Sequence, residues 1–283
     1  MNLRTALLLT CLSIPILAQQ PQNPSPMVEH TRAHPRLKQE SPAGRRENLE
    51  IGTLFLPAGL KLKSQTPLLI FMHGGSWLPE LAVDQVGGTA VLTIQLKAGA
   101  GTYAKIFEDT ARFDKLLAEA ESKAGVKFAP LTLAGWSAGC QTVRELLKIP
   151  RYYDLTARIL LIDGIHTSYV GGKPGPQESQ IETDNLAIFV RFAHDAIAGK
   201  KQMIVTHSEI FPGTFASTTE TADYLVAQLG LKRTATAKWG PMQTQQLSEV
   251  RQGKFLLVGY AGNSAPDHVD QLHSLPDYLR WLK

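Results

Sequence analysis

Short apolar runs alternate along the chain with longer segments in which apolar residues recur three or four positions apart. The first pattern predicts buried strands, and the second predicts amphipathic helices. Strands are expected at 49–56, 68–72, 90–96, 131–134, 159–162, 203–206 and 255–260. Helices are expected at 107–123, 141–148, 219–229 and 269–282. This alternation predicts an α/β fold with a mostly parallel central sheet flanked by helices.

Two segments depart from the simple alternation. Residues 242–250 and 254–260 flank a short polar turn, which predicts an antiparallel pair. Residues 165–201 separate two predicted strands and contain a Gly/Pro-rich stretch followed by an apolar helical pattern at 185–198. An excursion of this length is typical of a loop that shapes a binding site. We therefore expect a lid-like insertion around 165–201.

The N-terminus differs in composition from the rest of the chain. Residues 1–18 combine Arg4, an apolar stretch interrupted by Pro15, and a small residue at Ala18. This pattern predicts a cleavable signal peptide, and hence a secreted or periplasmic protein with no stable membrane insertion. Residues 19–46 are rich in Pro, Gln and charge, which predicts a mobile arm. Residues 47–283 are long enough for one α/β domain.

Charge and cysteine content exclude several classes of function. The formal net charge is +4 and no basic stripe interleaves with aromatic residues, so nucleic acid is not a predicted partner. Signal cleavage removes Cys11 and leaves Cys140, which rules out an intrachain disulfide. We expect Cys140 to be a buried, unreactive thiol.

No cofactor or metal is predicted. The segment Gly99-Ala100-Gly101 lacks the third glycine and the acidic partner of a dinucleotide-binding loop, and no phosphate-binding loop is present. The histidines at 166, 194 and 207 have acidic neighbours but lack a metal-ligand spacing.

The pentapeptide Gly135-Trp136-Ser137-Ala138-Gly139 fits the pattern G-x-S-x-G. A predicted strand precedes it and a predicted helix follows it, which is the context of a nucleophile elbow. Glycines on both sides let the turn be tight, and the helix N-terminus faces developing negative charge. The pattern therefore makes Ser137 a candidate nucleophile.

Polar residues also follow the other predicted strands. They are His73-Gly74-Gly75-Ser76-Trp77, Asp163-Gly164, His207-Ser208-Glu209, and Gly262 to His268. Because ligands bind outside the carboxyl ends of the strands in open α/β sheets, these residues are expected to share one edge.

The chain resembles the α/β-hydrolases, which carry an HGG-type loop, then the G-x-S-x-G elbow, an acid and a late histidine in that order. The resemblance implies a triad with Ser137 as nucleophile and His268 as base. His268 is expected in a short loop before the terminal helix, whereas its competitor His273 would lie within that helix. Asp163 is the favoured acid because it ends an apolar strand, and Glu209 is the alternative acid.

The remaining site residues follow from the same resemblance. The amide of Ala138 and the amide of Gly75 would form the oxyanion hole, with Gly74 or Ser76 as alternatives to Gly75. Two aromatic residues, Trp77 and Tyr103, are candidates for lining the substrate pocket. His73 is expected to have a structural role.

These features predict a secreted serine hydrolase, with a carboxylic ester, small or polymeric, as substrate. A peptidase or amidase with the same triad is a second interpretation, because sequence does not distinguish the leaving groups. A third is a binding module that kept the fold without catalysis. The oligomeric state is not predicted.

Overall fold

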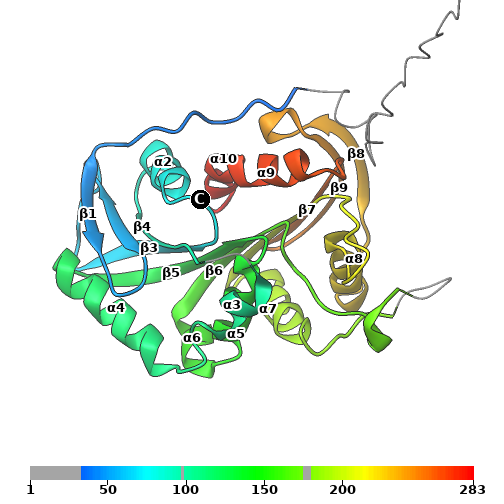
Figure 1. Ribbon diagram of the computed structural model, residues 1–283, viewed down its shortest axis with the longest axis horizontal. Helices are drawn as coiled ribbons and strands as arrows, with labels where there is room; N and C mark the ends of the chain where they lie inside the picture. Colours follow the sequence, from blue (N-terminus) through cyan, green and yellow to red (C-terminus); the bar gives the residue numbers. More distant parts are fainter. Residues whose placement is uncertain (1–32, 97–98, 175–179) are drawn as a thin grey trace, which may run out of the picture.

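The strands form at the short apolar runs, and the computed structural model joins them into one sheet (Figure 1). It describes residues 33–96, 99–174 and 180–283, so the predicted signal peptide lies outside the described residues. The ten strands found in these ranges are β1 (Gly44–Asn48), β2 (Thr53–Pro57), β3 (Gln65–Met72), β4 (Ala90–Ile94), β5 (Lys127–Trp136), β6 (Thr156–Ile162), β7 (Gln202–His207), β8 (Thr234–Trp239), β9 (Gln245–Gln252) and β10 (Phe255–Tyr260).

The spatial order of the strands is β1-β2-β4-β3-β5-β6-β7-β10-β9-β8. From β4 to β10 each strand runs parallel to its neighbour, and the pairs at both edges are antiparallel. The predicted α/β class, with a mostly parallel sheet flanked by helices, is confirmed. The antiparallel pair predicted near the C-terminus is β9 with β10, in which Gln252 lies opposite Phe255.

Helices cover the two faces of the sheet as separate layers (Figure 1). One core contains Leu78, Leu272 and Tyr278, from three helices on one face. A larger core lies on the other face. The first layer is α2 (Trp77–Val86), α9 (Ala265–His273) and α10 (Leu275–Trp281). The second is α3 (Ala100–Lys105), α4 (Ala111–Ala124), α5 (Gly139–Leu147), α6 (Pro150–Leu155), α7 (Ala187–Ile197) and α8 (Thr218–Gln228).

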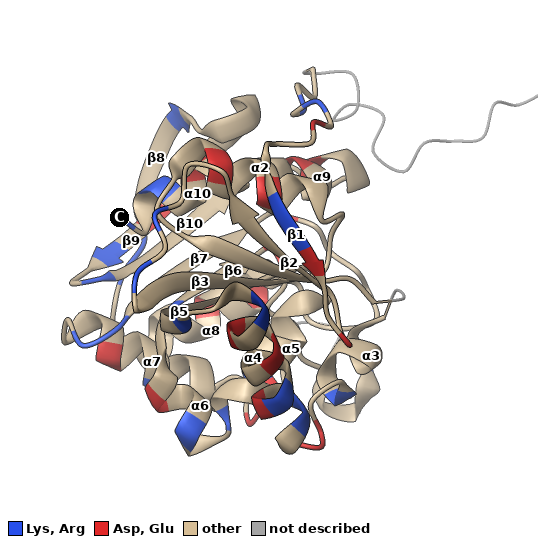
Figure 2. Cartoon of the chain, turned by 90° about the vertical axis from the view of Figure 1, so that its left-hand side faces the viewer, with Lys and Arg blue, Asp and Glu red and all other residues tan. Residues whose placement is uncertain are grey.

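Positions of Lys and Arg alternate with positions of Asp and Glu along the helices of these layers (Figure 2). On α4, for example, Lys123 pairs with Glu119 at 3.5 Å, and Arg112 approaches Glu50 at 3.9 Å. Such exposed pairs contribute little to stability, but they keep the surface polar.

The apolar run at 49–56 does not form one strand. The Leu49 amide donates to the Gly52 carbonyl at 3.0 Å, and this turn joins β1 to β2. Gly52 has φ +85° there, a conformation that favours glycine. The hairpin begins at Gly44, so β1 includes the last residues of the segment that we expected to be a mobile arm.

The insertion expected around 165–201 is only partly a loop. Its helix, α7, buries Phe189 and Phe192 in the larger core, so it is a crossover helix between β6 and β7 rather than a lid. The loop before it carries an isolated bridge between Tyr169 and Ile181.

Two helices replace the single one expected at 269–282. Ser274 ends α9, and Pro276 lies in the first turn of α10, where its missing N–H costs no helical hydrogen bond. The segment at 33–37 contacts α9. His34 Nδ1 lies 2.6 Å from Asp270 Oδ2, and the Leu37 amide donates to His273 Nδ1 at 3.1 Å.

Candidate active site

The turn from β5 to α5 places Ser137 in a left-handed conformation, with φ +51°. Its amide donates to the Ile162 carbonyl at 3.0 Å, which ties the turn to the end of β6. A Cβ at Gly135 would lie 2.6 Å from the Cys140 nitrogen, and one at Gly139 would collide with the Met72 carbonyl. Both glycines of the motif are therefore required by close backbone packing.

Asp163 directly follows β6 and is almost completely buried. Its carboxylate accepts four hydrogen bonds, from the Ser208 amide and hydroxyl at 2.8 Å each, from Thr218 Oγ1 at 2.7 Å, and from His268 Nδ1 at 2.7 Å. Burial alone raises the pKa of Asp163, but the bond and charge of His268, with the other donors, outweigh it and lower the pKa to about 2. The group is therefore a carboxylate at neutral pH.

His268 lies in the first turn of α9, not in a loop before the helix as expected. A capping box starts the helix earlier, because the Ser264 hydroxyl donates to Asp267 Oδ2 at 2.6 Å and the Ser264 amide donates to the same oxygen at 3.1 Å. A carboxylate only accepts, so Nδ1 of His268 carries a proton toward Asp163, and in the neutral imidazole Nε2 is the acceptor.

Trp136 fixes the position of His268 from the elbow side. Its Nε1 donates to the His268 carbonyl at 3.1 Å, and the two rings lie 4.6 Å apart. The same indole stacks on His73 at 5.0 Å with an interplanar angle of 12°. The ends of β3 and β5 and the start of α9 therefore meet around one aromatic side chain.

The alternative acid, Glu209, and the alternative base, His273, make contacts different from those of Asp163 and His268. Glu209 is exposed, and its amide donates to the Gly262 carbonyl at 2.8 Å. His273 is buried against Trp77, with ring centroids 5.7 Å apart, and accepts from the Leu37 amide. The carboxylate that meets His268 in the described part of the chain belongs to Asp163.

The glycine-rich loop after β3 begins with His73 at φ +72° and Gly74 at φ +118°. The Gly74 amide donates to Gln95 Oε1, so it is already engaged. Gly75 and Ser76 are exposed at the tip of the loop, whereas Ala138 immediately precedes helix α5. Of the predicted loop donors, Gly75 and Ser76 therefore remain candidates beside Ala138.

The two aromatic residues predicted for the substrate pocket, Trp77 and Tyr103, both have packing roles. Tyr103 is fully buried, and its hydroxyl lies 3.0 Å from His73 Nδ1 and accepts from the Leu96 amide at 2.8 Å. These contacts link the first residue of the glycine-rich loop, His73, to the end of β4. Trp77 begins α2 and packs on the opposite side of the sheet.

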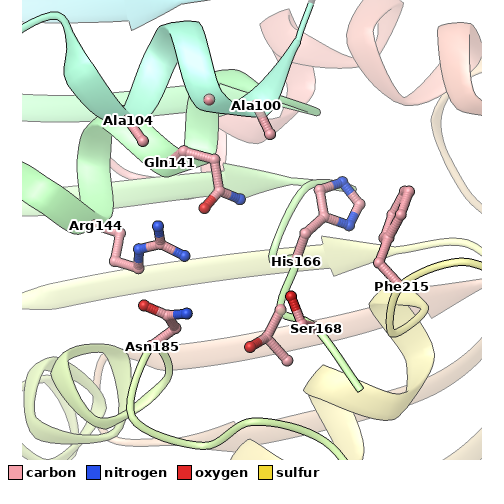
Figure 3. Close-up of a pocket in the computed structure, with 10 residues that line it drawn as sticks. Ala100, Ala104, Gln141, Arg144, His166, Ser168, Asn185 and Phe215 are labelled. Carbon is pink, nitrogen blue, oxygen red and sulfur yellow. The ribbon is translucent and has the colours of Figure 1, made fainter. Parts of the chain in front are cut away.

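A cavity of about 310 Å³ lies beside α5 (Figure 3). Sequence reasoning missed the side chains that line it, among them Gln141, Arg144, His166, Asn185 and Phe215. A signal was available for the first two. Counted from Ser137, they are four and seven residues further on, the spacing of one helix face.

Among the described residues, the histidines at 166, 194 and 207 do not share a group of potential metal ligands. His207 is buried and accepts from Arg233 Nη1 at 2.9 Å, while His194 is exposed on α7. Cys140 is buried, and burial raises the pKa of its thiol. A thiol with a raised pKa is a poor nucleophile at neutral pH, in line with the prediction of an unreactive cysteine. In the part of the chain that the structure describes, His34, Asp267 and Asp270 do offer ligand atoms within 4.8 Å of one another.

Comparison with known proteins finds similarity in structure but not in sequence. No protein-family model and no curated protein matches the chain. A cold-adapted esterase from an Arctic intertidal metagenomic library aligns over 88% of this chain and 98% of its own, with 16% identity and a TM-score of 0.47. Acetyl xylan esterase from Aspergillus awamori aligns over 79% and 93%, with 14% identity and a TM-score of 0.45.

A hormone-sensitive lipase from a metagenome library gives 12% identity over 88% of this chain and 87% of its own, with a TM-score of 0.45. The predicted resemblance to α/β-hydrolases holds at the level of the fold, with its parallel sheet and strand–elbow–helix unit. Identities this low leave the activity to be argued from the site itself.

No helix among the described residues has the length and apolarity needed to cross a membrane.

Proposed function

We propose that this protein is a serine hydrolase that cleaves carboxylic esters through an acyl-enzyme on Ser137. The observation that carries the proposal is the 2.7 Å hydrogen bond between His268 and the buried Asp163 carboxylate, at the sheet edge where the elbow presents Ser137. An ionised carboxylate costs free energy when buried, and here four hydrogen bonds offset that cost.

In the proposed reaction, His268 Nε2 takes the proton of the Ser137 hydroxyl as its oxygen attacks the ester carbonyl. Asp163 holds the imidazole in the tautomer that leaves Nε2 basic, and stabilises the imidazolium that forms. The tetrahedral oxyanion would accept from the Ala138 amide and from the Gly75 or Ser76 amide. His268 then protonates the leaving alcohol, and a water activated by the same nitrogen hydrolyses the acyl-enzyme.

The test is labelling of the mature protein with a fluorophosphonate, together with hydrolysis of p-nitrophenyl acetate. We expect both in the wild type and neither in Ser137→Ala. The matched control is Ser122→Ala, an exposed serine on α4, which should behave as the wild type. A folded Ser137→Ala protein that still hydrolyses the ester would refute the proposal. Absence of labelling in a folded wild type would favour a binding module.

Export is part of the proposal and rests on the sequence of residues 1–18 alone. Expression of the full chain should give a periplasmic or extracellular product that begins near Gln19. A chain without residues 1–18 should stay in the cytoplasm. Retention of an uncleaved full chain would contradict it.

A further inference from the structure

The cavity beside α5 is walled by α3, α5, the loop after β6 and the loop after β7, with Phe215 on one side (Figure 3). The elbow that carries Ser137 leads directly into α5, and Gln141 lies one turn further along that helix. His166, in the cavity wall, lies three residues after Asp163 in the same loop. The cavity wall is therefore built in part from the helix and the loop that follow two of the proposed catalytic residues, Ser137 and Asp163.

Several polar side chains of this wall make no side-chain hydrogen bond to any described residue. They are the buried Gln141, the half-buried Asn185 and the exposed Ser168, whose polar atoms are open to the cavity. His166 Nδ1 is buried without a partner among the described residues. A buried polar group left unsatisfied costs about 1–3 kcal/mol, and the other side chains named here have donors and acceptors free to bind a ligand.

Arg144 gives the cavity a positive charge. Its side chain is 11% exposed, and Nε donates to Glu145 Oε1 at 2.7 Å, which leaves both Nη groups directed into the cavity (Figure 3). Lys148 binds both oxygens of Glu145 at 3.0 Å, so these two cations and one anion leave a net charge of +1. Burial lowers the pKa of His166 to about 4, so this histidine adds no charge at neutral pH.

We propose that this cavity binds a free carboxylate carried by the acyl part of the ester substrate. The planar guanidinium of Arg144 would hold the carboxylate, since its paired N–H groups match carboxylate geometry. Gln141, Asn185 and Ser168 would bind oxygens next to it, and Phe215 would cover its carbon skeleton. The assignment rests on the proposed ester hydrolase function and names the class of ester.

The test compares two matched substrates, the p-nitrophenyl monoester of glutaric acid and p-nitrophenyl valerate, which differ in the terminal carboxylate. We expect a kcat/KM at least tenfold higher for the glutarate ester in the wild type. Arg144→Met should lower that ratio about tenfold to a hundredfold, because a hydrogen bond to a charged group is lost. Arg280→Met removes an exposed arginine on α10 and should keep the wild-type ratio.

A second measurement requires no variant and therefore survives a failure of Arg144→Met to fold. Salt screens charge, so the preference of the wild type for the glutarate ester should shrink between 0.05 and 0.5 M NaCl, while valerate hydrolysis stays level. Free glutarate should inhibit p-nitrophenyl acetate hydrolysis more strongly than free valerate does.

The outcomes separate the two proposals. Hydrolysis of p-nitrophenyl acetate with no preference for the glutarate ester would overturn the carboxylate site and leave the proposed function standing. A preference that Arg144→Met retains in a folded protein would also overturn it. Failure to hydrolyse p-nitrophenyl acetate would overturn the proposed function, and this assignment with it.

Discussion

Trp136 and His268 contact each other in two ways. The indole N–H donates to the His268 carbonyl at 3.1 Å, and the two rings lie 4.6 Å apart. Because His268 lies in the first turn of α9, this pair sets the position of that helix relative to the end of β5. Asp163 takes no part in the contact, so the imidazole is positioned from two independent sides.

Replacing Trp136 with Phe keeps an aromatic ring and removes the donor. A neutral hydrogen bond contributes about 0.5–1.5 kcal/mol, so we expect kcat for p-nitrophenyl acetate to fall about threefold to tenfold. KM should change little, because the indole contacts His268, the proposed base, and not the substrate. Trp281→Phe, on α10, is the control. An unchanged kcat in a Trp136→Phe protein would mean that the indole does not position His268.

Asp163→Asn tests the acid directly. An amide is nearly isosteric with the carboxylate but favours the wrong imidazole tautomer, so kcat should fall about 10⁴-fold. Glu209→Gln should retain wild-type kcat, because Glu209 is exposed. Steady-state kinetics of the two variants decide between the acids, and the reverse result would assign the role to Glu209.

Stability should fall in mild acid because of His207. Burial and the charge of Arg233 lower the pKa of His207 to about 4, below its ordinary value of 6.5. The unfolded chain therefore binds a proton that the folded chain excludes, and stability is lost as pH falls from 6.5 towards 4. The expected loss from this group is about 3 kcal/mol.

Urea denaturation across this pH range measures the effect. His207→Gln keeps an acceptor for Arg233 and should flatten the dependence, with the rest coming from His166, whose pKa burial also lowers to about 4. His194→Gln, at an exposed position, should leave the slope as in the wild type. An equally steep slope in His207→Gln would argue against a neutral, buried His207.

Gly164 is required by packing under the elbow. A Cβ at this position would lie 2.6 Å from the Ser137 nitrogen and 2.7 Å from Cys140 Sγ. We expect Gly164→Ala to destabilise the fold by at least about 2 kcal/mol and to reduce esterase activity, since the turn must shift. Thermal unfolding and ester hydrolysis are the measurements. Gly59→Ala meets no atom within 4 Å and should be neutral.

The segment at 33–37 should stabilise α9. His34 and Arg36 both contact Asp270, which is fully buried, and removing a partner of a buried charge is costly. The double variant His34→Ala, Arg36→Ala should lower Tm by several degrees, at about 2–4 °C per kcal/mol for a domain of this size. Lys38→Ala, at an exposed neighbouring position, should leave Tm unchanged. Equal Tm values would show that the segment does not brace the helix.

The parallel core of the sheet was predictable because each central strand is a short apolar run bounded by polar residues. Leu131 to Ala134 and Ile159 to Ile162 are buried almost without exception, and such strands need both faces covered. The elbow was predictable from its two glycines. Only residues without a side chain fit where β5, α5 and β3 approach closely, so Gly135 and Gly139 mark the turn.

Other features depend on tertiary contacts that the local pattern does not contain. Strand β8 is almost wholly exposed at the sheet edge, so no apolar run marks it. The hydroxyls that hold Asp163, from Ser208 and Thr218, lie 45 and 55 residues away and look like ordinary loop residues. Arg144 could not be singled out from the sequence. It is one of several charged residues on an amphipathic helix, and the sequence does not show which of them points into a cavity.

The contact between His34 and Asp270 joins residues 236 positions apart. Synthesis runs from the N-terminus, so His34 is made long before Asp270. Their contact can form only after almost the whole chain has been made. Closing so long a loop is entropically expensive until the intervening sheet has assembled. Protection of residues 33–40 from a protease during refolding would therefore time the last stage of folding, and a chain truncated before α9 would leave this segment cleavable.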